Sequence, residues 1–67
     1  MKEEAAKALH QEMLDRSRQA GEMAALYSVQ FVQSEDPVHK ATALRHLEAE
    51  ALWRAAAELV RQARANG

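Results

Sequence analysis

The sequence contains no cysteine, and it has only one proline, two glycines and three aromatic residues in 67 positions. Without cysteine, a disulfide framework, a thiolate metal site and a thiol nucleophile are all excluded. Val, Ile and Thr together occur only five times, which leaves little material for a β-sheet. No apolar run approaches the ~20 residues of a membrane-spanning helix, and no signal peptide is visible. We therefore expect a cytoplasmic protein without membrane contact.

The charge is nearly balanced, since 9 Lys and Arg residues stand against 10 Asp and Glu residues. A surface that binds a phosphate backbone or an anionic membrane needs a surplus of positive charge, so nucleic acid is an unlikely partner. Alanine, by contrast, is abundant and occurs 15 times. Because alanine has the highest helix propensity, the composition predicts a small all-α protein.

The one strong helix breaker is the segment 33–37, which ends in Pro37. Proline suits the first turn of a helix and disfavours helical backbone in the residue before it, so Asp36 is the natural N-cap. The sequence thus predicts one domain over 1–67, with a helix at about 3–32, a turn at 33–36 and a helix at about 37–65. A turn this short makes the helices antiparallel neighbours. A break of the first helix at Gly21 is the alternative.

The main apolar stripe of the first helix includes Tyr27 and Phe31, which we expect to pack against the second helix. If the chain reverses near residue 35, Gly21 lies opposite Ala49, and small residues on both sides permit a close approach of the backbones. The broad apolar face of the second helix is expected to turn toward the first. Its larger members are Val38, Leu44, Leu47, Leu52, Leu59 and Val60.

Both helices carry more apolar surface than one neighbour covers. Leu14, Val29 and Val32 form a second stripe on the first helix, and Trp53 and Val60 lie at the edge of the apolar face of the second. An exposed apolar patch usually marks an interaction site. We therefore predict a four-helix bundle, formed with a second copy or with another helical protein. A self-contained three-helix fold is the alternative.

Two charged residues, Arg45 and Glu48, fall inside the apolar arc of the second helix. Because they are three positions apart, they can pair across one helical turn at the rim of the arc. They can also cross a helix–helix interface and set its register or the choice of partner. Trp53 has two interpretations as well, as an ordinary core residue or as an anchor of an interface.

No motif for catalysis or metal binding is present. His39, His46 and Glu50 share part of one helix, but neither an H-E-x-x-H nor a Glu-x-x-His motif occurs, so we interpret them as a solvated polar face. Glycine is too scarce for a phosphate-binding loop. None of the side-chain hydroxyls of serine and threonine has the sequence context of a nucleophile elbow. The sequence predicts no enzyme, no metal or cofactor and no small-molecule substrate.

Two resemblances follow from this plan. The hairpin resembles Rop-type RNA-binding four-helix dimers in architecture, which implies an RNA- or antitoxin-type regulator, although the basic face that such a role requires is missing. The segment Asp36-Pro37, followed by Leu47-Glu48-Ala49 and apolar residues through Val60, is similar to small co-chaperones of the type III secretion needle protein. That resemblance implies a helical hairpin that acts as a chaperone or adaptor subunit.

Overall fold

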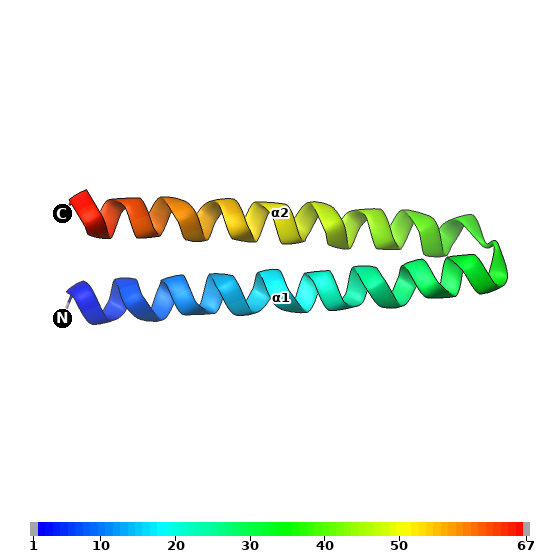
Figure 1. The fold of residues 1–67 in the computed structure, drawn as a ribbon, viewed down its shortest axis with the longest axis horizontal. Coiled ribbons are helices and arrows are strands. Elements are labelled where there is room, and N and C mark those ends of the chain that lie inside the picture. Colours follow the sequence, from blue (N-terminus) through cyan, green and yellow to red (C-terminus); the bar gives the residue numbers. More distant parts are fainter. Residues whose placement is uncertain (1, 67) are drawn as a thin grey trace.

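The computed structural model describes residues 2–66 and shows two long antiparallel helices joined by a tight turn (Figure 1). Helix α1 runs over Lys2–Ser34, and helix α2 runs over Pro37–Asn66. The prediction of an all-α helical hairpin is confirmed. Helix α1 continues through Gly21 without interruption, so the alternative with a break at this residue is wrong. The resulting rod measures 49 × 14 × 11 Å.

The turn consists of Glu35 and Asp36 alone, so α1 ends two residues later than the sequence indicates. Glu35 adopts a left-handed backbone conformation (φ 59°), and its amide donates to the Phe31 carbonyl at 2.7 Å. A left-handed residue after the last helical residue is a common helix stop, although glycine usually fills that position. On the other side of the turn, the Asp36 carboxylate accepts from the Val38 amide at 2.9 Å, which confirms the predicted N-cap.

The contact line between the helices, here called the seam, is built from small residues. Its Ser17 hydroxyl donates to the Glu50 carbonyl of α2 at 3.1 Å, a hydrogen bond that requires close backbones. No large side chain among residues 2–66 is fully buried, so the hairpin has no core of bulky residues. The buried residues of the seam are Ser17, Ala20 and Ala24 of α1, and Ala43 and Ala57 of α2.

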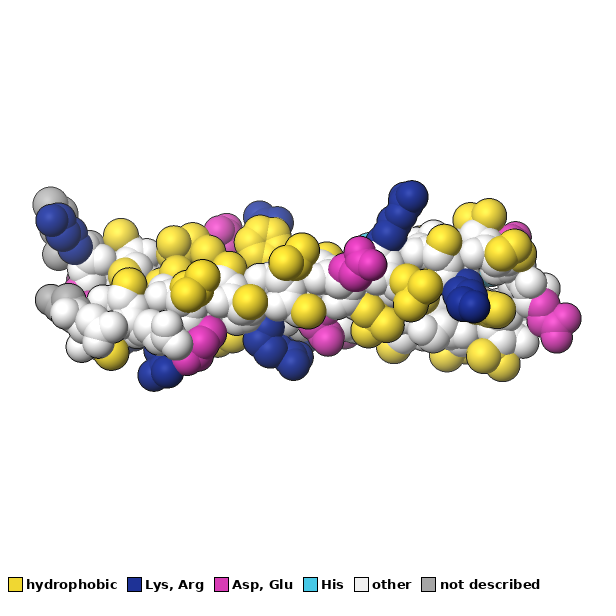
Figure 2. Space-filling view, turned by 90° about the horizontal axis from the view of Figure 1, so that it is seen from above, with side chains coloured by type: hydrophobic (Ala, Val, Ile, Leu, Met, Phe, Trp, Pro, Cys, Tyr) yellow, Lys and Arg dark blue, Asp and Glu magenta, His cyan; other side chains and the backbone are white. Residues whose placement is uncertain are grey.

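The rotation of α2 differs from the expectation that its broad apolar face turns toward α1. The large apolar residues of that face are exposed, and Leu52 and Leu59 show 71% and 66% of their surface. Small residues allow the two backbones to approach, whereas a row of leucines holds helices farther apart. Figure 2 looks onto the outer side of α2 and shows hydrophobic side chains along most of its length, interrupted by charged ones.

The histidines of α2, expected on a solvated face, lie instead beside α1. The His46 ring stacks on Tyr27, with the ring centroids 5.6 Å apart and the planes 5° from parallel. His39 lies 6.3 Å from the same tyrosine, and its Nδ1 is 2.8 Å from the Ser34 hydroxyl. Tyr27 therefore packs against α2 as expected. Phe31 is also half-buried at this end of the hairpin, where the Lys40 ammonium lies 5.9 Å from its ring.

The expected pairing of Gly21 with Ala49 is wrong. A Cβ atom added to Gly21 would meet the carboxylate of Glu50, which lies across the glycine. Ala49 is half-buried in a groove on the other side of the seam, next to Ala20 and Trp53. A shift of one residue along α2 moves a side chain by 100° around the helix, which is enough to exchange these neighbours.

Candidate interaction surface

The seam divides the hairpin into two flanks. On one flank, a groove between the helices continues into an apolar depression on α2, and this side is called the Trp53 flank. On the other, a groove crosses Gly21 and the Glu50 carboxylate, and this side is called the Glu50 flank. The groove of the Trp53 flank is lined by Arg16, Gln19, Ala20, Met23, His46, Ala49 and Trp53, and the depression by Ala49, Leu52, Trp53 and Ala56. The groove of the Glu50 flank is lined by Leu14, Ser17, Arg18, Gly21, Glu22, Ala25, Glu50 and Arg54.

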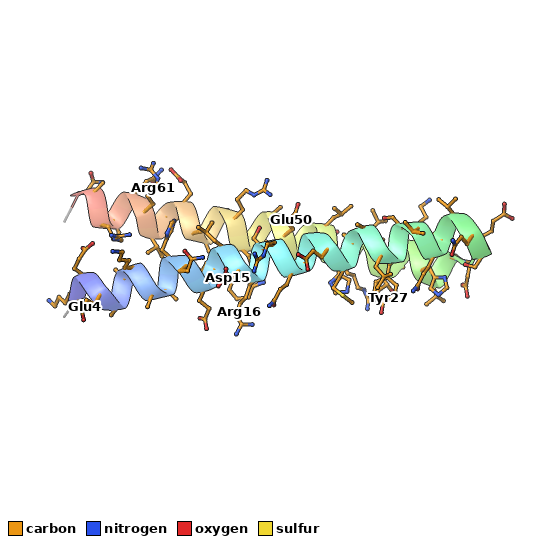
Figure 3. The ribbon with its side chains drawn as sticks, turned by 60° about the horizontal axis from the view of Figure 1, so that its bottom comes forward. Glu4, Asp15, Arg16, Tyr27, Glu50 and Arg61 are labelled. Carbon is orange, nitrogen blue, oxygen red and sulfur yellow. The ribbon has the colours of Figure 1, made fainter. Side chains whose placement is uncertain are left out.

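Figure 3 separates the two flanks, with Arg16 and Tyr27 projecting at one edge and Glu50 and Arg61 at the other. Helical spacing extends each flank beyond its groove. Leu26 follows Met23 by three residues, which places it on the Trp53 flank at the end near the turn. Arg61 follows Arg54 by seven residues, which places it on the Glu50 flank.

The Trp53 flank is largely apolar, and both helices contribute to it. From α1 come Leu9, Met23 and Leu26, all exposed, and from α2 comes Leu52. Trp53 itself is half-buried at the bottom of the groove. The depression on α2 is bounded only by alanine, leucine and tryptophan side chains. The apolar arc of α2 is therefore rotated away from the seam, toward the side on which Leu9, Met23 and Leu26 of α1 are exposed.

The main charge in this groove, that of Arg16, has two partners. The guanidinium of Arg16 lies 5.3 Å from the centroid of the Trp53 ring, a cation–π contact. Its Nη2 atom is also 3.8 Å from the Glu12 carboxylate, one helical turn earlier. Arg16 and Glu12 are both exposed and carry opposite charges, so together they add little net charge to the groove.

The Glu50 flank carries ion pairs. Arg54 lies 3.8 Å from the Glu50 carboxylate, and Arg61 donates from Nε to the Glu58 carboxylate at 2.9 Å. The hydrogen bonds from Arg61 hold the pKa of the Glu58 carboxyl below its ordinary value, and the Glu58 carboxylate raises the pKa of Arg61. Both groups are fully exposed, so solvent screens this pair strongly.

The structure does not bring the predicted interface residues together on one surface. Leu14 lines the Glu50 groove, and Val29 and Val32 follow the same side of α1, where Val32 is 80% exposed. Trp53 and Val60, by contrast, are half-buried beside α1. The expectation that a single antiparallel neighbour leaves both of them outside its arc is therefore wrong. One flat partner surface cannot cover the two groups at once.

Arg45 and Glu48 are both exposed on α2, and the structure places no ion pair between them. Arg45 precedes Leu52 by seven residues, so it lies at the rim of the Trp53 flank. The surface members that the predicted interface does not include are Met23, Leu26 and Leu52. The apolar periodicity of Leu52 was visible, but it indicated the contact between the helices.

The serine and threonine hydroxyls of the described residues are hydrogen-bonded to the backbone. Each serine and threonine hydroxyl donates to a backbone carbonyl, for example Ser28 to Ala24 at 2.7 Å and Thr42 to Val38 at 2.9 Å. Within residues 2–66, no three His, Asp or Glu side chains are grouped so that they hold a metal ion. Neither helix, over the residues described, has an apolar stretch long enough to cross a bilayer.

Comparison with known proteins gives no match, whether with protein-family models, with curated proteins or with solved structures. The interpretation of the surface therefore depends on its own geometry and chemistry.

Proposed function

We propose that the protein is a non-enzymatic protein–protein interaction module that packs its Trp53 flank against the helices of a partner. The observation that carries this proposal is the division of side chains by size. Small residues fill the seam, while the leucines and Met23 lie on the outside. Burying one such side chain contributes ~1.5–3 kcal/mol, so a partner that covers several of them stabilises the assembly substantially.

The shape of the surface favours a helical partner. The apolar strip follows two antiparallel helices, from Leu9 to Leu26 on α1, a length of about 26 Å, and from Ala49 to Ala56 on α2. A pair of helices laid along this strip completes a four-helix bundle, in which each helix buries two sides. The same surface suits a chaperone or adaptor subunit, because such a subunit shields the apolar face of a helical client. We place this activity in the cytoplasm.

The proposal is tested with two substitutions on α2. Leu52→Glu introduces a charge on the Trp53 flank, and Leu47→Glu introduces the same charge at an exposed leucine on the side of Arg54. In extracts of the native host, the tagged wild-type chain and Leu47→Glu should elute with an assembly larger than 7.5 kDa. Leu52→Glu should elute as the free chain. A wild-type chain that elutes as a monomer in the extract contradicts the proposal.

A further inference from the structure

The Trp53 flank matches a second copy of itself. We infer that the partner is another copy of this chain, related by a two-fold axis at the level of the Arg16–Trp53 contact. This inference rests on the proposed function. In this arrangement α1 packs antiparallel on α1 of the second copy, and α2 on α2. The evidence is a symmetry in the order of side chains along both helices.

On α1, residues alternate at spacings of three and four along the Trp53 flank, the pattern of a helix-packing seam. Leu9 and Leu26 lie equally far on either side of the midpoint between residues 17 and 18. Arg16 and Gln19 lie equally far on either side of the same point. An antiparallel copy centred there places leucine on leucine at both ends, and Glu12 beside Met23 of the second copy. It also places Arg16 beside the Gln19 amide oxygen of the second copy, which can accept from the guanidinium.

On α2, the apolar depression has a symmetry of its own. It is lined by Ala49, Leu52, Trp53 and Ala56, which are arranged symmetrically about the midpoint between residues 52 and 53. An antiparallel copy centred there places Ala49 against Ala56 of the second copy, and Leu52 against Trp53 of the second copy. Large side chains thus meet in the middle, with small ones on both sides, which allows the helices to pack closely.

The two midpoints lie next to each other in the folded hairpin. Arg16 is next to the midpoint of α1, and Trp53 is next to the midpoint of α2. The guanidinium carbon of Arg16 lies 5.3 Å from the centroid of the Trp53 ring. One axis therefore passes through both centres of symmetry. The helical pattern alone does not require this coincidence, because it depends on the register that the turn and the seam impose. In the alternative arrangement, α1 packs on α2 of the second copy. Arg16 then lies against Leu52 of the second copy and has no Gln19 amide oxygen as a hydrogen-bond acceptor.

The size and charge of the surface fit a homodimer. A specific interface buries about 800 Å² on each partner, which along a rod of 49 Å corresponds to a strip about 16 Å wide. Two helices of about 10–12 Å diameter lying side by side provide that width. The net charge of the chain is −1, and Arg16 is already paired with Glu12, so two copies do not repel each other strongly.

The absence of cysteine makes this geometry directly testable. Leu52→Cys places a thiol beside the axis, where the two copies of residue 52 approach each other within the Cα distance of a disulfide, about 4.4–6.8 Å. Leu59→Cys is the matched control, because it changes the same residue type on the same helix at similar exposure. Position 59 lies about 6.5 residues from the axis, so its two copies are about 20 Å apart along the helices.

Under mild oxidation, Leu52→Cys should convert mostly to a disulfide-linked dimer, and Leu59→Cys should not. A mixture of Leu59→Cys and Arg45→Cys should cross-link, because the axis brings position 45 of one copy to within one residue of the level of position 59 of the other. Sedimentation equilibrium of the purified wild-type chain should give twice 7.5 kDa at tens of micromolar. The emission of Trp53, the only tryptophan, should shift to the red as the dimer dissociates on dilution.

The outcomes separate this inference from the function on which it rests. A purified chain that sediments as a monomer, while the extract still holds a larger assembly that Leu52→Glu abolishes, overturns the homodimer and leaves the interaction module standing. A dimer in which Leu59→Cys cross-links as fast as Leu52→Cys overturns the proposed axis. A monomer in both purified form and extract overturns the homodimer and the proposed function together.

Discussion

The two flanks of the hairpin are built from the same two helices, yet they differ in chemistry. On the Trp53 flank, Met23, Leu52 and the half-buried Trp53 line a groove and an apolar depression, and the exposed guanidinium of Arg16 lies over the indole. On the Glu50 flank a carboxylate lies across a glycine, and arginine–glutamate pairs follow α2 beside the exposed Leu14 and Val32 of α1. A hairpin whose flanks differ in this way is suited to pack its Trp53 flank against other helices. Four predictions test this difference.

The largest expected effect comes from a pair of substitutions on α1. Met23 on the Trp53 flank and Leu14 on the Glu50 flank are 37% and 39% exposed, so Glu at either position alters the isolated hairpin to a similar degree. Met23→Glu should raise the dissociation constant of the assembly about 10- to 100-fold, since burial of such a side chain contributes ~1.5–3 kcal/mol and the proposed axis places the new carboxylate beside Glu12 of the second copy. Leu14→Glu should change it less than about twofold. Sedimentation across a dilution series measures both, and equal effects would remove the distinction between the flanks.

The second prediction concerns the seam that separates the flanks. Ala57 is buried against α1, and Ala55, two residues earlier, is exposed. Ala57→Leu should lower the free energy of unfolding by about 1–3 kcal/mol, because the close helices leave no room for the larger side chain. Ala55→Leu should stay within about 0.5 kcal/mol of the wild type. Urea unfolding at one fixed protein concentration compares them, and a tolerated leucine at position 57 would contradict the seam of small residues.

The third prediction uses the glycine on the Glu50 flank. Gly21→Ala should raise the free energy of unfolding by up to ~1 kcal/mol, because alanine is the better helix former. The added methyl group displaces only the Glu50 carboxylate, the mobile end of a flexible side chain. Thermal unfolding followed by circular dichroism provides the measurement. A lower melting temperature would show that Glu50 is held in place more firmly than its ion pair with Arg54 implies.

The smallest effect belongs to the ion pair of the Glu50 flank. The pKa of Glu58 is lowered in the folded protein by the hydrogen bonds from Arg61, so the pair stabilises the fold above the unfolded pKa. That contribution disappears as the pH falls through the lowered pKa of the folded state. NMR titration of the Glu58 carboxyl should show the lowered value, and Arg61→Gln should return it toward normal. An unchanged Glu58 pKa in the variant would assign the shift to another group.

The sequence was sufficient for the helices and the turn, because these depend on local signals. Pro37 and the Asp36 cap defined the start of α2, and the alanine content favoured helix on both sides. The last two residues of α1 were missed. The helix ends at Glu35 in a left-handed backbone conformation, which glycine adopts most readily, so a glutamate at this position gives no sequence signal for the end of the helix.

The rotation of the helices about their own axes was not predictable from the same pattern. Apolar periodicity locates the apolar arc of α2 but not the part of that arc that α1 covers. Burial of apolar area alone favours a contact made by leucines, whereas a close approach of the two backbones favours a contact made by Ala43 and Ala57. The close approach of the backbones determines the rotation of α2. The exposure of Leu52 and Leu59 was therefore missed, and Trp53 and Val60 lie closer to α1 than expected.

The seam of small residues has a consequence for the thermodynamics of the chain. The heat-capacity change of unfolding grows with the apolar area that unfolding exposes, and an isolated hairpin without a bulky core hides little of it. The stability curve of the isolated hairpin is therefore shallow in temperature. If the proposed homodimer forms, assembly supplies most of the curvature, and the folded fraction then depends on the concentration of the protein.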